Sequence, residues 1–317
     1  MSGLPEFIEP MLAKLGGEAF DSDQHRFEVK WDGTRSLCFA EGGGYRLRNR
    51  KADDQGPRYP ELSFLSALPS GTVLDGEIVV MKDGRPDFHG MLQREQVRDA
   101  RKARHKAKEL PAVFVAFDLL YRDFESRMER PLSERVEELA EVVAAVGDER
   151  LVFSDGVIGA GTTLFESIRA REMEGIVAKR LNSTYHPGRR TEAWIKIKPV
   201  HTTHCVVLGW ERDAEGGLKS LIIAMEEEGS LRCVGKVGSG LTAALRARLE
   251  AELPRRKRPK PLISCEGVKG EWIEPGLFCT VSYLERTGEG NLRAPVFREL
   301  FEDDSWSANE SKNEPPH

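Results

Sequence analysis

The chain has 317 residues, of which 39% are hydrophobic and 31% are charged, and its net charge is −5. No apolar run approaches the roughly 18 residues that a membrane span requires, and the N-terminus lacks a secretion-signal pattern, so we expect a cytoplasmic protein. The five cysteines are widely spaced and form no C-x-x-C pair, which argues against a zinc site or a disulfide framework.

The first two hundred residues mix strand and helix patterns, as an α+β domain does. Strands are predicted at 26–31, 35–40 and 45–50, with a hairpin turn at 41–44. Further along, the pattern predicts a loop and short helix at 57–68, a strand pair or bent strand at 72–81, a helix at 95–109, a central apolar strand at 112–120, a helix at 133–146 with Ser133 as its N-cap, a short helix at 165–171, and strands at 175–179 and 193–197.

The pattern changes after Pro199. Short predicted strands at 205–210, 220–225, 231–237 and 279–284 are divided by glycine-rich or charged turns, and one helix is predicted at 242–253. This arrangement suits a small barrel of the oligonucleotide-binding type, or OB-fold. We therefore expect an α+β domain at 1–200, an all-β OB-fold domain at 201–304 and a disordered tail at 305–317.

One stretch, FEVKWDGTR at residues 27–35, combines a strand pattern with reactive side chains. Apolar and charged residues alternate up to Asp32, so Lys30 and Asp32 are expected on one strand face before the turn at Gly33. A lysine beside a carboxylate at a strand end is a candidate covalent nucleophile, provided that its amine loses a proton. The same pattern also describes a solvated edge strand with an Asp-Gly turn.

Charged residues also lie inside other apolar strands. They occur in LDGEIV (Asp75 and Glu77), FDLL (Asp118, after Phe117), EGIVAK (Glu174 and Lys179) and WIKIKP (Lys196 and Lys198). Each one alone reads as a salt bridge at a strand end. Because buried charges are costly unless they are paired, several on successive strands indicate a shared polar cleft that is suited to a phosphate and a divalent cation.

In this order, six motifs resemble those of ATP-dependent DNA ligases in the covalent nucleotidyltransferase superfamily. They are KWDG (30–33), RNR (48–50), LDGEIV (74–79), FDLL (117–120), EGIVAK (174–179) and WIKIKP (194–199). Three later stretches resemble the barrel domain of bacterial ligases of the non-homologous end-joining type: GKVGSGL (235–241), WIEPGL (272–277) and NLRAPVF (291–297). The resemblance covers about residues 5–304 and implies a nucleotidyltransferase (adenylation) domain followed by an OB-fold domain.

The resemblance implies roles for the residues that would bind the nucleoside. Lys30 matches the nucleophile that attacks the α-phosphate of ATP and holds AMP. Glu28 matches the residue that recognises the adenine amino group, and Phe117 would stack on the base. Glu77 and, in part, Arg35 match ribose contacts.

Further matched residues would bind phosphates and metal. Arg50 matches an arginine near the ribose and the nick phosphate. Glu174 matches a ligand of the divalent cation, Mg²⁺ or Mn²⁺, and Asp32 would orient the nucleophile or help to hold that metal. Lys196 and Lys198 match a pair that faces the α-phosphate and neutralises charge in the transition state.

By this resemblance, the protein is a DNA-repair ligase that seals nicks bearing a 3′-hydroxyl and a 5′-phosphate. Adenylylation of the lysine is followed by transfer of AMP to the 5′-phosphate and by attack of the 3′-hydroxyl. The implied partners are nicked double-stranded DNA and a Ku-like end-binding protein. We expect a monomer at the bacterial nucleoid, with a mobile connection near Pro199.

Two basic runs, at 94–108 and 255–260, are candidates for contacts with the DNA backbone, although such runs often form a solvated helix face. The predicted DNA-binding residues are Arg50, Arg94, Arg98, Arg101, Arg255 and Arg256.

The sequence departs from the family at one place. The R-x-D-K element that reaches the leaving pyrophosphate is replaced by Phe301–Asp304, so we expect weak adenylylation from ATP. Two alternatives stay open: an RNA ligase or GTP-using capping nucleotidyltransferase, and a non-catalytic or first-step-impaired nick-binding scaffold. The NAD⁺-dependent ligases match poorly, because this chain lacks their four-cysteine zinc module.

Overall fold

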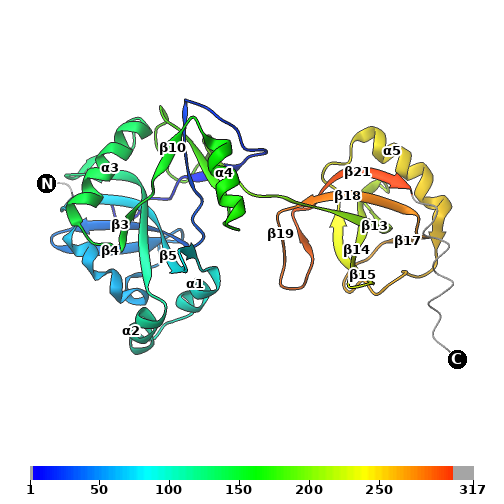
Figure 1. The fold of residues 1–317 in the computed structure, drawn as a ribbon, viewed down its shortest axis with the longest axis horizontal. Coiled ribbons are helices and arrows are strands. Elements are labelled where there is room, and N and C mark those ends of the chain that lie inside the picture. Colours follow the sequence, from blue (N-terminus) through cyan, green and yellow to red (C-terminus); the bar gives the residue numbers. More distant parts are fainter. Residues whose placement is uncertain (1–2, 303–317) are drawn as a thin grey trace. The chain divides into compact units, whose positions relative to one another are not determined.

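The chain folds into two compact units in a computed structural model that describes residues 3–302. The first unit ends at Lys198 and the second begins at Pro199, beside the boundary expected from the sequence (Figure 1). The expected tail at 305–317 lies outside the described residues. None of the helices within 3–302 has the length and apolar character that a bilayer crossing requires.

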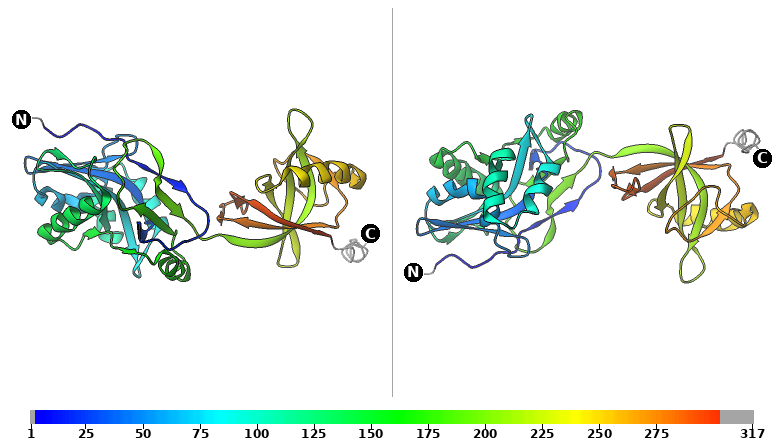
Figure 2. Two further views of the ribbon diagram at one scale, coloured as in Figure 1. Left: turned by 90° about the horizontal axis from the view of Figure 1, so that it is seen from above. Right: turned by 90° about the horizontal axis from the view of Figure 1, so that it is seen from below.

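The larger sheet of the first unit has seven strands, whose main path runs β4-β3-β5-β7-β8. These are β4 (Gly44–Asn49), β3 (Thr34–Glu41), β5 (Thr72–Lys82), β7 (Ala112–Arg122) and β8 (Glu125–Ser126), with β6 (Arg85–Pro86) paired to β5 and β9 (Leu151–Phe153) paired to β7. Helix α3 (Leu132–Val146) packs on one face of this sheet (Figure 2).

The smaller sheet runs β1-β12-β11-β2-β10. Its strands are β1 (Leu12–Leu15), β12 (Arg190–Ile197), β11 (Ile176–Arg180), β2 (His25–Val29) and β10 (Gly156–Ile158). Helix α4 (Gly161–Ala170) covers it through Ile168, which packs on Phe27 and Ile176.

The two sheets enclose a shared core because side chains alternate along each strand. On β3, Leu37 and Phe39 pack toward the smaller sheet in a cluster that includes Trp194 of β12. Cys38 and Ala40 point the other way, into the cluster beneath α3. The functional side chains described below lie at the edge of this core.

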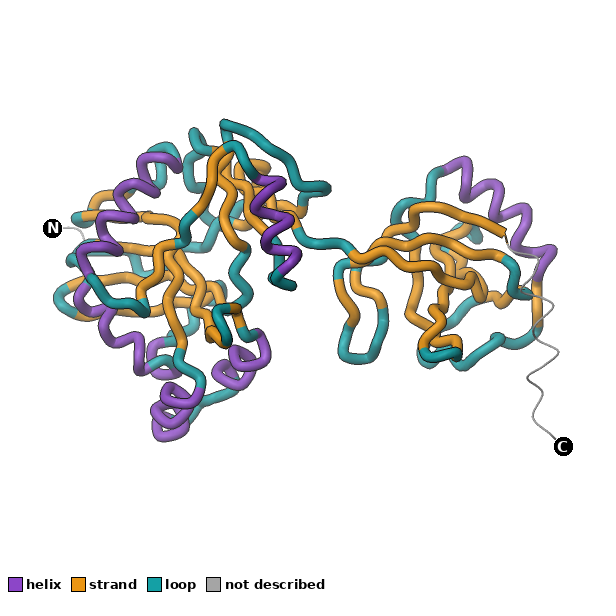
Figure 3. Tube along the Cα trace, viewed as in Figure 1, coloured by secondary structure: helices purple, strands orange, loops and turns teal. Residues whose placement is uncertain are grey.

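The second unit is an OB-fold domain built mainly of strands (Figure 3). Its sheet runs β15-β14-β13-β17-β16, and β18 joins β13 to β21. The elements are β13 (His201–Arg212), β14 (Leu218–Glu227), β15 (Ser230–Val237), α5 (Ala243–Glu252), η3 (Leu253–Arg256), β16 (Lys257–Arg258), β17 (Glu271–Ile273), β18 (Leu277–Tyr283), β19 (Glu285–Arg286), β20 (Leu292–Arg293) and β21 (Val296–Glu302).

Two local predictions need correction. The helix expected at 95–109 begins only at Ala100, as α2 (Ala100–Glu109), because Asp99 caps it by accepting hydrogen bonds from two backbone N–H groups; a separate helix, α1 (Phe88–Glu95), precedes it and was not predicted. Ser133 lies inside α3, whose N-cap position is Pro131. Residues 72–82 form one strand with register shifts, which agrees with the bent strand and not with the strand pair. The segment at 57–68 is confirmed as short helix, in the 3₁₀ form: η1 (Gly56–Arg58) and η2 (Pro60–Ala67).

Phe114 of β7 is fully buried beneath α3, whereas Phe88 of α1 is 50% exposed. We expect Phe114→Ala to lower the free energy of unfolding of the first unit by about 3–5 kcal/mol, since it removes a buried ring and leaves a cavity. Phe88→Ala, the matched control, should change it by less than about 0.5 kcal/mol. Urea unfolding followed by circular dichroism measures both, and equal effects would contradict this assignment of the core.

Candidate functional site

Two connected cavities open at the edge of the core in the first unit. The inner pocket, of about 90 Å³, lies between the sheets and is lined by Glu28, Phe117, Lys179 and Trp194, among others. The outer cleft, of about 650 Å³, is lined by charged side chains at the surface. Five residues line both: Ala13, Lys30, Arg35, Glu77 and Lys196.

Lys30 lies at the junction of the two cavities. Strand β2 ends at Val29, and the backbone N–H of Lys30 then donates to the carbonyl oxygen of Gly175 at 2.9 Å. Its Nζ forms a very short ion pair with Oε2 of Glu174, whose Oε1 lies 2.5 Å from Nζ of Lys198. One carboxylate therefore holds two lysine ammonium groups side by side.

The expectation that Lys30 and Asp32 share a strand face was wrong, because both residues follow the end of β2. Asp32 instead lines a separate side cleft of about 310 Å³, together with Glu174. The two predicted metal-binding carboxylates thus border one cavity, and Lys30 reaches Glu174 from another.

Two glycines let the backbone approach closely enough to form this junction. A Cβ atom on Gly33 would lie 2.2 Å from the carbonyl oxygen of Ile78, in β5. A Cβ atom on Gly175 would lie 2.2 Å from the carbonyl oxygen of Ile197, and Gly175 also has a φ of +136°. Any side chain at these positions would push the segments bearing Lys30 and Glu174 away from their strands.

Arg35 and Asp75 form a buried ion pair in the wall of the inner pocket. Nε and Nη2 of Arg35 each donate to Asp75 at 2.5 Å, and the hydroxyl of Tyr185 donates to the same carboxylate at 2.6 Å. The Arg35 guanidinium also lies 4.5 Å from the centre of the Phe117 ring. Asp75 is therefore a buried partner that fixes Arg35, while Glu77, two residues along β5, lines the cavity.

Glu77 has an unusual protonation state for a carboxyl group. Burial raises its pKa to about 8, and the nearby positive charges of Arg35 and Lys30 offset this only in part. A raised pKa favours the protonated carboxyl group, which can donate a hydrogen bond. That property suits a hydroxyl group as its partner.

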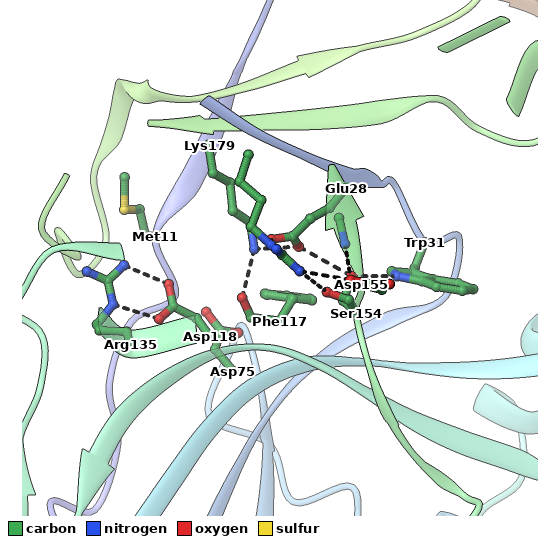
Figure 4. Close-up of polar contacts among 12 residues, drawn as sticks. Met11, Glu28, Trp31, Asp75, Phe117, Asp118, Arg135, Ser154, Asp155 and Lys179 are labelled. Atoms are coloured by element: carbon green, nitrogen blue, oxygen red, sulfur yellow. Dashed lines mark hydrogen bonds and ion pairs between the residues drawn. The ribbon is translucent and has the colours of Figure 1, made fainter. Parts of the chain in front are cut away.

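Glu28 and Phe117 are joined through Lys179, from β11 (Figure 4). Nζ of Lys179 donates to Oε2 of Glu28 at 2.8 Å and to the carbonyl oxygen of Phe117 at 2.8 Å. It also lies 4.6 Å from the centres of the Phe117 and Trp194 rings. The sequence had drawn attention to Lys179 as the end of EGIVAK but assigned it no role. Arg26 and Ser154, which also contact Glu28, carried no signal in the sequence.

Lys196 of β12 completes the lining between the inner pocket and the outer cleft. Burial lowers its pKa, and the positive charges of Lys30, Lys198 and Arg190 lower it further. This concentration of positive charge is suited to an anion such as a phosphate group.

The far part of the outer cleft is lined by basic side chains that make no ion pair with any of residues 3–302. They are Arg50, Lys51, Arg58 and Arg98. Arg190, on the opposite side, donates a hydrogen bond to the backbone oxygen of Ala13. Because cations without carboxylate partners attract phosphates, this cleft is a candidate nucleic-acid interface.

Arg94 does not belong to that interface, which corrects the sequence prediction. Its side chain is fully buried, and its guanidinium binds Glu61 at 2.7 and 3.0 Å as well as the backbone oxygens of Leu110 and Arg58. Because the whole side chain is buried, including the unpaired Nε, Arg94 cannot contact DNA.

The remaining predicted DNA-binding arginines differ in their surroundings. Arg101 is exposed on α2, and Arg255 is exposed in η3. Arg256 forms ion pairs with Glu252 and Glu302, both at 3.1 Å, so it is less available than Arg255.

The side cleft fits a hard divalent cation only in part. Among residues 3–302, no three metal-ligating side chains gather closely enough to hold an ion by themselves. Glu174 and Asp32 both line this cleft. Magnesium typically takes one or two carboxylates and completes its shell with substrate phosphates and water, so these two residues match such a site when a phosphate is bound.

The pKa of Glu77 predicts how stability depends on pH. Between pH 4.5, the usual pKa of a glutamate, and about 8, the unfolded chain has lost this proton and the folded chain retains it. The free energy of unfolding should therefore fall as the pH rises through this window. In Glu77→Gln that fall should be smaller, as measured by urea unfolding at pH 5 and pH 8. Equal falls in the two proteins would contradict the raised pKa.

Comparison with known proteins agrees with this geometry. The model of the family described as "ATP dependent DNA ligase domain" matches residues 10–198, and that of the "ATP dependent DNA ligase C terminal region" matches residues 214–304. The chain is 34% identical over 314 residues to the multifunctional non-homologous end joining protein LigD of Mycolicibacterium smegmatis, covering 94% of this chain and 39% of that protein. It is also 34% identical to DNA ligase C of Mycobacterium tuberculosis, covering 78% of this chain and 70% of that protein.

Solved structures give the same result. The ligase domain of M. tuberculosis LigD superposes with a TM-score of 0.55 at 32% identity, covering 93% of this chain and 95% of that one. A mycobacterial DNA ligase D in complex with ATP gives a TM-score of 0.53 at 33% identity, covering 94% and 96%. The chain spans about two fifths of the length of the LigD relatives that it matches. The resemblance inferred from the motifs is confirmed: the chain belongs to the family of ATP-dependent DNA ligases.

Proposed function

We propose that this chain seals nicks with a 3′-hydroxyl and a 5′-phosphate in double-stranded DNA, through AMP held covalently on Lys30. The observation that carries the proposal is the position of Lys30. Its side chain lines both a pocket with an aromatic wall and a cleft whose far part is lined by the basic side chains of Arg50, Lys51, Arg58 and Arg98. A nucleotide in the first cavity and a DNA phosphate in the second would both reach the same amine.

In the first step, the Lys30 ammonium group loses a proton to water, and the neutral amine then attacks the α-phosphate of ATP. A nitrogen–phosphorus bond forms, and the bond to the leaving pyrophosphate breaks. Lys196 and Lys198 would neutralise the negative charge that builds up on the α-phosphate. The ion pair of Glu174 with Lys30 and Lys198 supports this role, because it gathers these groups before the nucleotide binds.

The inner pocket would bind the adenosine. Phe117 offers its ring to the base. Glu28 offers a carboxylate to the adenine amino group, and the protonated carboxyl group of Glu77 together with Arg35 faces the ribose. These assignments rest on the residues that line the pocket.

We place a Mg²⁺ ion, with Mn²⁺ as a substitute, beside Glu174 and Asp32, where nucleotide phosphates would complete its shell. When bound, this ion supplies Lewis-acid stabilisation of phosphate charge. Glu174 would then exchange lysine contacts for the metal.

The second and third steps require the nick. AMP passes from Lys30 to the 5′-phosphate, and the 3′-hydroxyl then attacks that phosphate and releases AMP. Arg50 and Arg98 in the outer cleft, Arg101 on α2 and Arg255 in the second unit would bind the backbone without reading the sequence of the DNA.

The names of the relatives support a proposal about the cellular process that this reaction serves. Several are named as non-homologous end joining proteins, so we propose that this chain acts in DNA repair, including end joining. We propose a monomer that works at the nucleoid with a Ku-like end-binding protein.

The replaced R-x-D-K element gives the second candidate function, a nick-binding protein that is impaired in its first step. Glu302 carries a negative charge at this place and pairs with Arg248 and Arg256. Phe301 lies beside it on β21, whereas the expected departures at 303 and 304 lie outside the described residues. A negative charge at this place repels the negatively charged triphosphate of ATP. We therefore propose that adenylylation from ATP is slow and that sealing of pre-adenylylated nicks is retained.

The decisive experiment incubates the purified protein with radiolabelled ATP and Mg²⁺, beside Lys30→Ala, and then adds a nicked duplex. We expect covalent label that survives denaturing electrophoresis and alkali but is released by acid, as a nitrogen–phosphorus bond would be, on the wild-type protein alone, followed by sealed DNA. Label from GTP in place of ATP would favour a capping-type enzyme, and preference for a nicked RNA would favour an RNA ligase.

Two further outcomes separate the candidates. Sealing of a pre-adenylylated nick without label from ATP would place a defect in the first step, whereas label from ATP at the rate of an intact relative would rule that defect out. A protein that binds nicks but performs neither reaction would contradict the ligase proposal.

Binding of a nicked duplex tests the outer cleft, through Arg98, and the exposed face of α2, through Arg101. Arg98→Gln and Arg101→Gln should each weaken binding, and each should reduce the slope of log K against log salt by about 1 per lost phosphate contact. Arg169→Gln, an exposed arginine on α4, should leave the slope unchanged. Fluorescence anisotropy at several salt concentrations measures this, and equal slopes in all the variants would remove the cleft from the interface.

A further inference from the structure

Lys179 bridges the two sheets across the back of the inner pocket. It belongs to β11 of the smaller sheet, as its partner Glu28 belongs to β2. Its other partner, the Phe117 carbonyl, belongs to β7 of the larger sheet. Figure 4 shows the ammonium group between the Glu28 carboxylate and Phe117. The buried ammonium group of Lys179 thus connects Glu28, which would face the edge of the adenine base, with Phe117, which would stack on its face.

The other contacts of Glu28 are longer. Ser154 donates to Oε2 from 3.3 Å, and Nε of Arg26 lies 3.2 Å from Oε1. The guanidinium of Arg26 also contacts the Ser154 carbonyl at 3.3 Å and Asp155 at 3.4 Å, so its interactions are divided. Lys179, at 2.8 Å and with its side chain 3% exposed, makes the shortest of these contacts with the carboxylate.

The orientation of Glu28 matters because adenine and guanine differ at the edge that it would face. Adenine presents an amino group that donates a hydrogen bond, whereas guanine presents a carbonyl oxygen in the same place. An ionised carboxylate can only accept hydrogen bonds, so it favours adenine and repels guanine. This discrimination requires the carboxylate to stay charged and at a set distance from the stacking ring.

We infer that Lys179 is the positioning residue for nucleotide choice: it fixes the Glu28 carboxylate relative to Phe117 so that the pocket selects adenine over guanine. The inference deepens the proposed function, because it rests on the adenine pocket assigned there. Lys179 need not touch the nucleotide. Its effect passes through Glu28 and Phe117.

The test measures equilibrium binding of ATP and GTP by calorimetry in EDTA, so that no chemistry takes place. Lys179→Met retains most of the apolar stem and removes the ammonium group. We expect the ratio of ATP affinity to GTP affinity to fall by about 10- to 100-fold, the fold-change that corresponds to loss of a hydrogen bond to a charged group. Lys179→Gln, which keeps a neutral donor, should give a smaller fall and disturb the fold less.

A second buried ion pair provides the matched control. Arg135 donates to Asp118 at 2.7 and 2.9 Å, both side chains are fully buried, and Asp118 is adjacent to Phe117 in the sequence. Arg135→Gln breaks a comparable pair without contacting Glu28. It should lower the thermal stability as Lys179→Gln does and leave the ratio of ATP to GTP affinity unchanged.

The outcomes are distinct. A lowered ratio in Lys179→Gln but not in Arg135→Gln supports the inference even if Lys179→Met fails to fold. Equal weakening of ATP and GTP binding in the Lys179 variants would assign Lys179 a purely structural role and overturn the inference. A wild-type protein that binds neither nucleotide would overturn the proposed function and this inference with it.

Discussion

Every charge that is buried between the two sheets must have a partner. This requirement governs the arrangement of charged side chains in the first unit. Asp75 is fully buried and binds Arg35 and Tyr185, and Glu28 is 2% exposed and binds Lys179. Removing one member of such a pair leaves an uncompensated buried charge, which typically costs about 3–5 kcal/mol. Each ion pair lies within one sheet, but Lys179 also donates to the Phe117 carbonyl and Tyr185 donates to Asp75, so these two hydrogen bonds link the buried pairs to the larger sheet beside the inner pocket.

The same pairs explain how a small pocket can be polar and rigid together. Arg35 is fixed by two hydrogen bonds to Asp75 and lies over the Phe117 ring, while Lys179 lies near that ring and near Trp194. Cations against aromatic faces are stabilised by the negative potential of the rings. The charged groups that would read a nucleotide are thereby set in place before it binds, which reduces the entropic cost of binding.

Lys30 lies where this pocket meets the larger outer cleft. The close approach of backbone at Gly33 and Gly175 brings its segment against both sheets. Glu174 then holds Lys30 with Lys198, so positive charge is gathered where a triphosphate would lie. In the far part of the outer cleft, Arg50, Lys51, Arg58 and Arg98 form no ion pair with any of residues 3–302, so a phosphate that binds there displaces only water and ions.

From the sequence alone, the order of motifs determined the family and the two domains. The resemblance also named Lys30, Glu28, Glu77, Phe117 and Lys196, all of which line the inner pocket. Only the tertiary structure decided which charged residues were already committed. Arg94 belongs to a basic run, yet it is buried in the fold and paired with Glu61, 33 positions away. Lys179 reads as the end of a strand, yet it pairs with Glu28, 151 positions away. Such partners come together only when distant elements of the fold pack against one another. Local sequence patterns therefore cannot predict them.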